Sequence, residues 1–266
     1  MNHADSPEAS PGRQMPLSGP SDPGSPGGPG GPGGSHALRG LREALLQPLC
    51  VVAVCALAVG LTLAGVAGAY NRERIEQAAA ERGGDTPRRV QEMQQLVQRL
   101  AGADELTQHQ QTNLFYNRTI RYLSDPRLYQ QADYWASPLE TFFHGRGDCE
   151  DYAIAKLFTL LAEGVPPAKL RMVVVKADLP ATATRAAESV GHMVLAYYPQ
   201  PDADPIILDN LTDEMRQASQ RPDLKPVYSF STEGLWEATG SRSLGDPMVR
   251  IAKWRDVMGR IRAEGF

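Results

Sequence analysis

A long uncharged segment decides which part of this chain can fold as a domain. Residues 44–71 contain no Asp, Glu, Lys or Arg and are rich in Val, Ala, Leu and Gly. Arg39 and Arg42 precede the segment, and Ala67-Gly68-Ala69 lies near its end. A basic flank, an apolar core and small residues at the end are typical of a secretory signal. We therefore expect residues 37–69 to be a signal peptide cut after Ala69, with a retained membrane anchor as the alternative.

The regions on either side of residues 37–69 differ in composition. Residues 1–36 contain 8 Pro, 9 Gly and 6 Ser. Such a sequence buries too little apolar area to offset the entropy of ordering, so we expect disorder there. Residues 70–266 remain as the folded domain, outside the cytoplasm in either case. The net charge of −4 and pI near 5.8 provide no basic surface for nucleic acid.

Apolar periodicity in residues 70–266 predicts helices in the first half and strands in the second. A long loop is expected over residues 124–147, and the turn at 199–205 should join two strands as a hairpin. The expected helices cover residues 72–81, a segment after Pro87, 105–123, 149–163 and 250–263, and the expected strands cover 170–177, 190–198, 206–208 and 227–230.

Cys149 stands at the expected start of a helix. Gly145 and Gly147 interrupt the preceding chain, Asp148 can cap the helix, and residues 152–158 are good helix formers. The positive end of the helix dipole favours a thiolate at this position. Residues 70–266 contain no other cysteine, so this part of the chain forms no internal disulfide. Cys149 is therefore a candidate nucleophile, and an inert buried cysteine is the alternative.

A cysteine nucleophile needs an imidazole base and a group that orients the imidazole. His192 lies on an expected strand, and Asp209 follows the next strand across a hairpin. Neighbouring antiparallel strands can place these two side chains together, with Cys149 at the opposite ring nitrogen. His144, five residues before the cysteine, is a rival base in a loop. His109 is expected on a helix surface.

Three acids flank the cysteine, and their charge opposes thiolate formation. Asp148, Glu150 and Asp151 could cap the helix and complement its dipole, since an Asp cap with an acid three residues later is close to a capping box. The alternative is a Ca²⁺ site, because clustered oxygen ligands suit a hard cation that would offset the repulsion. The spacing matches no EF-hand.

Several motifs in order resemble the bacterial transglutaminase-like cysteine proteinases. The resemblance covers roughly residues 85–240. The segments that carry it are 133–140 (DYWASPLE), 147–156 (GDCEDYAIAK), 192–198 (HMVLAYY), 208–211 (LDNL), 221–224 (RPDL), 226–230 (PVYSF) and 234–236 (GLW).

This resemblance implies an α+β domain with a papain/transglutaminase-like fold, in which the nucleophile helix packs on an antiparallel sheet beside N-terminal helices. It implies Cys149 as nucleophile, His192 as general base and Asp209 as the group that orients the base. It also implies calcium dependence, with Asp148, Glu150 and Asp151 as ligands. Trp135 either lines such a site or packs in the core.

The resemblance further implies a periplasmic endopeptidase that cuts a large surface adhesin near its N-terminus, in a di-alanine region, and so promotes biofilm dispersal. An inner-membrane cyclic-di-GMP receptor would hold the enzyme inactive. Two alternatives remain: a transglutaminase or amidase with the same site, and a non-catalytic calcium-dependent binding module.

Overall fold

The computed structural model describes residues 70–182, 184, 186–238 and 240–266. The expectations for residues 1–36 and 37–69 lie outside this range. Among the described residues, no helix has the length and apolarity needed to cross a membrane.

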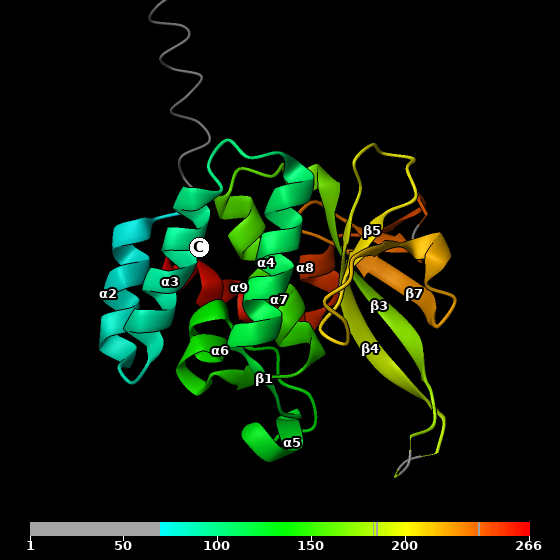
Figure 1. The fold of residues 1–266 in the computed structure, drawn as a ribbon, viewed down its shortest axis with the longest axis horizontal. Helices are drawn as coiled ribbons and strands as arrows, with labels where there is room; N and C mark the ends of the chain where they lie inside the picture. The colour runs from blue at the N-terminus through cyan, green and yellow to red at the C-terminus, as the bar shows by residue number, and fades with distance from the viewer. Residues whose placement is uncertain (1–69, 183, 185, 239) are drawn as a thin grey trace, which may run out of the picture. The chain divides into compact units, whose positions relative to one another are not determined.

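The described chain runs from helices to strands and closes with helices (Figure 1). The helices are α2 (Arg72–Arg82), α3 (Thr86–Arg99), α4 (Glu105–Thr119), α5 (Asp125–Leu128), α6 (Pro138–His144), α7 (Cys149–Ala162), α8 (Pro247–Arg250) and α9 (Ala252–Glu264). The strands are β1 (Arg121–Tyr122), β2 (Arg146–Gly147), β3 (Leu170–Leu179), β4 (Glu188–Tyr197), β5 (Ile206–Leu208), β6 (Arg216–Gln217), β7 (Leu224–Phe230), β8 (Leu235–Glu237) and β9 (Ser243–Gly245).

One antiparallel sheet holds seven of these strands in the order β6-β5-β4-β3-β7-β8-β9. The β3–β4 hairpin forms its centre and pairs Leu170 with Tyr197 through to Leu179 with Glu188. The β3–β7 register shifts between Val174 and Val175, where Pro226 stands opposite. Proline has no backbone N–H for the ladder, which accounts for the irregularity at this point.

Helix α7 lies between the sheet and the other helices, as Figure 1 shows. Every residue from Glu150 to Leu160 is buried. Ile154 and Leu157 belong to the main core, together with residues of β3, β4 and α9. A helix that is buried on all sides must be apolar almost all round, and the run from Tyr152 to Leu161 satisfies this requirement with few exceptions. The expected α+β class, with the Cys149 helix on an antiparallel sheet, is confirmed.

Two segments differ from the sequence expectation. The helix expected over residues 105–123 ends at Thr119, because Ile120 is extended and Arg121–Tyr122 pair in parallel with β2. The long loop expected over residues 124–147 contains α5, α6 and β2. Helix α6 begins with a capping box between Ser137 and Glu140.

His109 is fully buried in α4, so its expected place on the helix surface is wrong. Its ring lies 3.9 Å from the Tyr197 ring, centre to centre, and its Nδ1 contacts the Glu105 carbonyl oxygen. The burial lowers the pKa of His109. This histidine thus joins α4 to the end of β4 in the neutral form.

Candidate active site

Cys149 is the first residue of α7, and the turn before it is tightly fixed. The Asp151 carboxylate accepts hydrogen bonds from the backbone N–H groups of Ala136, at 2.8 Å, and Asp148, at 3.2 Å. A Cβ on Gly147 would lie 2.5 Å from Asp151 Oδ2, so a larger residue would push this cap aside. Gly147 therefore allows the close approach that holds the start of the helix.

His192 and Asp209 meet as their strands predict. His192 lies on β4, and Asp209 directly follows β5, whose Leu208 pairs with Leu195 of β4. His192 Nε2 lies 2.8 Å from Asp209 Oδ1. Both side chains are buried. Burial acts to raise the pKa of Asp209. The hydrogen bond and electrostatic attraction of His192, with hydrogen bonds from Leu211 and Arg221, outweigh burial and lower this pKa to about 2. The carboxylate is therefore ionised at neutral pH.

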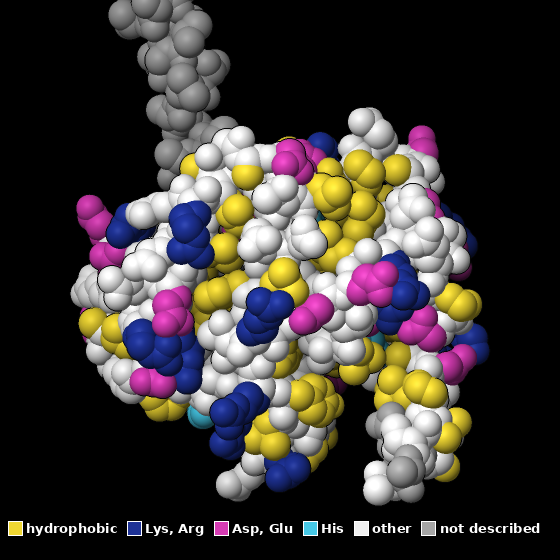
Figure 2. Space-filling view, viewed as in Figure 1, with side chains coloured by type: hydrophobic (Ala, Val, Ile, Leu, Met, Phe, Trp, Pro, Cys, Tyr) yellow, Lys and Arg dark blue, Asp and Glu magenta, His cyan; other side chains and the backbone are white. Residues whose placement is uncertain are grey.

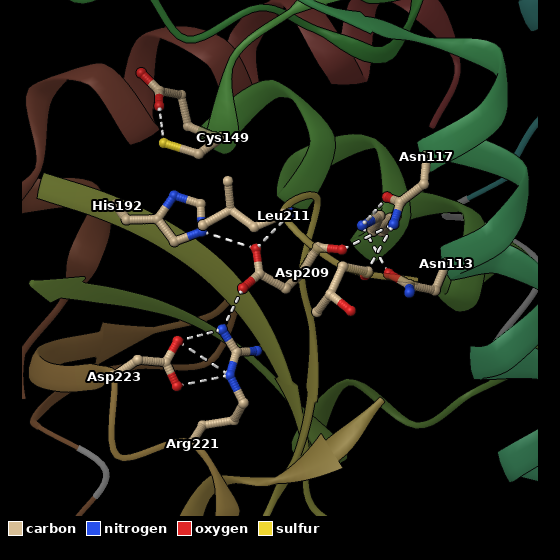
Figure 3. A network of polar contacts seen from close by, with 11 residues as sticks. Asn113, Asn117, Cys149, His192, Asp209, Leu211, Arg221 and Asp223 are labelled. Atoms are coloured by element: carbon tan, nitrogen blue, oxygen red, sulfur yellow. Dashed lines mark hydrogen bonds and ion pairs between the residues drawn. The ribbon is translucent and has the colours of Figure 1, made fainter. Parts of the chain in front are cut away.

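The imidazole lies between the Cys149 sulfur and the Asp209 carboxylate, and its Nδ1 is turned toward the sulfur (Figure 3). The thiol itself donates to Glu150 Oε2 at 3.0 Å. Burial, and next the Glu150 charge, strongly raise the pKa of Cys149. In the absence of a cation, these effects outweigh the helix dipole and keep the thiol protonated.

The chain after Asp209 is anchored from the opposite side (Figure 3). The Asn117 amide donates to the backbone oxygens of Asp209, at 3.0 Å, and Thr212, at 3.1 Å. Lys156, fully buried on α7, donates to the side-chain oxygens of Asn117, at 2.8 Å, and Asn113, at 2.7 Å. The lysine thereby fixes which end of the Asn117 amide faces the loop. These bonds place the Asp209 backbone relative to the helix that carries Cys149.

Acidic side chains gather beside the thiol. Asp148 and Glu150 approach Cys149 closely enough to share one ion. Asp125 joins Asp148 and Asp151 in a second such group, and Asp125, Asp133 and Glu150 form a third. The set of three ligands expected from the sequence omitted Asp125 and Asp133, which α5 and the chain after it bring to the site. Asp125 and Asp133 approach α7 through tertiary packing, so the spacing of residues in the sequence could not predict their place in the cluster.

Two observations show that this cluster fits a hard cation. Asp125 Oδ1 and Asp148 Oδ1 are buried and accept no hydrogen bond from any described residue. Burial, and then repulsion by Asp148, raise the pKa of Glu150 to about 8, while burial raises that of Asp125 to about 6. Buried oxygens without partners, in a group of carboxylates, suit Ca²⁺. Asp148 and Asp151 form the capping box of α7 and also belong to one of these groups, so the capping and metal interpretations are compatible in the same acids.

We expect the stability of the protein in chelator to fall as pH rises from about 4 to about 8. The carboxyl groups of Asp125 and Glu150 have raised pKa values in the folded state, so folding favours their protonated forms. The unfolded chain loses these protons first, near pH 4, and the folded state is penalised until they leave it too. Thermal unfolding should show a Tm lower by several degrees at pH 8 than at pH 5.

Excess Ca²⁺ should reduce this fall, and Glu150→Gln should reduce it in chelator. An equally steep pH dependence in Glu150→Gln would contradict the prediction.

The other residues considered from sequence lie elsewhere. His144 is the last residue of α6, and its ring packs edge-on against Tyr129. Trp135 is buried and stacks on Phe230, with ring centres 5.6 Å apart. Core packing is therefore the role of Trp135, one of its two expected roles.

Comparison with known proteins shows the family of the chain. Residues 85–223 match the family described as bacterial transglutaminase-like cysteine proteinase (BTLCP). LapG of Legionella pneumophila is 38% identical, with a TM-score of 0.60 over 73% of this chain and 99% of LapG. EGTA-treated LapG is 40% identical, with a TM-score of 0.62 over 73% of this chain and 100% of that chain. Calcium-bound LapG is 40% identical, with a TM-score of 0.60 over 72% of this chain and 99% of that chain.

No curated protein sequence matches. The family match spans more than half of the chain, and the solved LapG structures are covered almost end to end. The protein belongs to the bacterial transglutaminase-like cysteine proteinases, has their papain/transglutaminase-like fold, and is a cysteine protease.

Proposed function

We propose that this protein is a periplasmic, calcium-dependent endopeptidase that cuts a large surface adhesin near its N-terminus, in a di-alanine region, and so promotes biofilm dispersal. Cys149 is the nucleophile, His192 the general base and Asp209 the group that orients it. The observation that carries the catalytic part is the 2.8 Å contact of His192 with Asp209, beside a cysteine at a helix start.

The chemistry follows from the two ring nitrogens of His192. Nε2–H donates to Asp209, which leaves the lone pair of Nδ1 on the side of the sulfur. Nδ1 takes the thiol proton as the sulfur attacks a peptide carbonyl. The imidazolium then gives that proton to the leaving amine, and a thioester with Cys149 remains. Water, deprotonated by His192, hydrolyses the thioester and frees the thiol.

The developing oxyanion needs donors, and the start of α7 provides one. The first N–H groups of a helix have no partner within it. The backbone N–H of Cys149 is such a group and lies beside the sulfur, so it can stabilise the tetrahedral intermediate.

Asp148, Glu150 and Asp151, joined by Asp125, would hold Ca²⁺ beside the nucleophile. The bound ion supplies positive charge that favours the thiolate. With its carboxylate oxygens engaged, Glu150 would no longer accept from the thiol, and the sulfur could turn to Nδ1 of His192. The calcium-bound and EGTA-treated forms of the similar LapG support this part.

Regulation by an inner-membrane cyclic-di-GMP receptor, which sequesters the enzyme, belongs to the same proposal. It rests on the family resemblance.

The test is the rate of Cys149 alkylation by iodoacetamide, followed by mass spectrometry, with Ca²⁺ or with chelator. We expect the rate in Ca²⁺ to exceed that in chelator by at least about tenfold, because only the thiolate reacts. Cleavage of a peptide with two adjacent alanines should show the same calcium dependence. Slow alkylation in both conditions would contradict the protease and favour a binding module. Amine incorporation into a glutamine peptide, without hydrolysis, would favour a transglutaminase.

A further inference from the structure

A buried arginine touches the far side of the Asp209 carboxylate (Figure 3). Arg221 is 7% exposed and directly follows the short helix Ala218–Gln220. Its Nη2 donates to Asp209 Oδ2 at 2.9 Å. The same guanidinium donates to Asp223, through Nε at 3.0 Å and Nη2 at 2.8 Å. The general mechanism of a Cys-His-Asp site has no role for this group.

The two oxygens of Asp209 have separate partners. Oδ1 lies against His192 Nε2 and accepts from the backbone N–H of Leu211 at 3.0 Å. Oδ2 accepts from Arg221. The terminal torsion of an aspartate is broad, so backbone placement alone does not fix the plane of its carboxylate. Asn117 anchors the backbone at this residue. The Leu211 N–H holds Oδ1, and Arg221 is the side chain that holds Oδ2 and so completes the fixing of the plane.

Arg221 is itself held by the sheet. The backbone oxygen of Asp223 accepts from the N–H of Asp178 on β3, at 2.9 Å. The backbone N–H of Leu224, the first residue of β7, donates to the Arg221 carbonyl at 3.0 Å. A planar guanidinium with several donors can bridge two carboxylates, which the single ammonium of a lysine does with less directional control.

The charges of this group also matter. A lone arginine beside Asp209 would weaken the pull of that carboxylate on an imidazolium at His192. Asp223 offsets this charge, since its carboxylate pairs with the same guanidinium. The ion pair of Arg221 and Asp223 can therefore orient the Asp209 carboxylate without adding a net positive charge beside it. The hydrogen bonds from the guanidinium, in turn, lower the pKa of Asp223.

We propose that Arg221, held by Asp223, is a positioning residue: it fixes the plane of the Asp209 carboxylate and thereby keeps His192 in the Nε2–H tautomer, with Nδ1 free for Cys149. The proposal rests on the catalytic roles given above. Arg221 influences the reacting sulfur only through Asp209 and His192.

The experiment compares Arg221→Met and Arg221→Lys with a control, Arg216→Met. Arg216 is an exposed arginine of β6, paired with Glu214. The purified full chain, labelled with ¹⁵N at histidine and kept in Ca²⁺, reports the His192 tautomer by NMR. The His192 signals are those missing from a His192→Asn sample. Cleavage of the di-alanine peptide gives kcat and KM.

We expect a single Nε2–H tautomer in the wild type and in Arg216→Met, and a mixture in Arg221→Met. The kcat of Arg221→Met should fall by about 10–100-fold with little change in KM, because a small misplacement of a catalytic group has this effect. Arg221→Lys should lie between the two, with partial rescue.

A folded Arg221→Met protein with a single Nε2–H tautomer and unchanged kcat would overturn the inference. If Arg221→Met fails to fold, Asp223→Asn replaces it, since this change removes the charge that holds the guanidinium. Asp223→Asn should then show a mixed tautomer, and a single Nε2–H tautomer there would likewise overturn it. Failure of the proposed function is distinct: the wild type would lack cleavage, while the tautomer readout would still decide the role of Arg221.

Discussion

Replacing Cys149 with alanine is expected to abolish peptide-bond hydrolysis while the fold remains intact. The loss should be at least about 10⁴-fold in kcat, because the nucleophile of such a site accounts for most of its rate enhancement. The change removes one sulfur from a half-buried position, so the free energy of unfolding should change by less than about 1 kcal/mol. Peptide cleavage followed by mass spectrometry, with circular dichroism for the fold, measures both.

The variant also supplies its own control. Asp125, Asp148 and Glu150 remain, so Ca²⁺ should still raise the Tm of Cys149→Ala. A variant that is stabilised by Ca²⁺ but inactive separates the nucleophile from the metal site. Hydrolysis at more than a few per cent of the wild-type rate would remove Cys149 from its assigned role.

Trp254→Ala is expected to cost about 3–5 kcal/mol of stability, the usual range for a large aromatic removed from a core. The Trp254 side chain is fully buried on α9. Its ring centre lies 5.2 Å from that of Phe230 on β7 and 6.4 Å from that of Phe158 on α7. The family match ends at residue 223. The chain beyond the match is therefore expected to be part of the same folding unit as the nucleophile helix.

Urea unfolding of Trp254→Ala measures this loss. The matched control is Val249→Ala, since Val249 is 75% exposed in the same region and should change stability by less than about 0.5 kcal/mol. A loss below about 1 kcal/mol in Trp254→Ala would show that α9 packs only loosely on the core.

Elements with a strong local signal were predictable from the sequence. The helix after Cys149 and the strands β3, β4 and β5 follow apolar patterns of period 3.6 or 2, and the observed bounds differ by about two residues or fewer. The contact of His192 with Asp209 follows from hairpin geometry. Helix α6 had a signal too, because Ser137 with Glu140 three residues later is a capping box, but the surrounding Pro and Gly residues favoured a loop.

Other features depend on packing that no local pattern contains. Asp125 and Asp133 reach the acidic cluster only because α5 and the following turn lie against the start of α7. His109 has polar neighbours along its helix, yet Tyr197 of a strand 88 positions later covers it. The role of Arg221 likewise needs the sheet, since Arg221 lies 12 positions after Asp209 in the chain.

The sheet ends in short strands within the described chain, which limits how other chains can join it. Its two borders are β6, with 2 residues, and β9, with 3 residues. A partner that adds a strand gains affinity from a row of main-chain hydrogen bonds, and such short borders offer few of them. The same shortness protects against edge-to-edge self-association. An extended peptide that pairs at either of these two borders must therefore rely mainly on side-chain contacts.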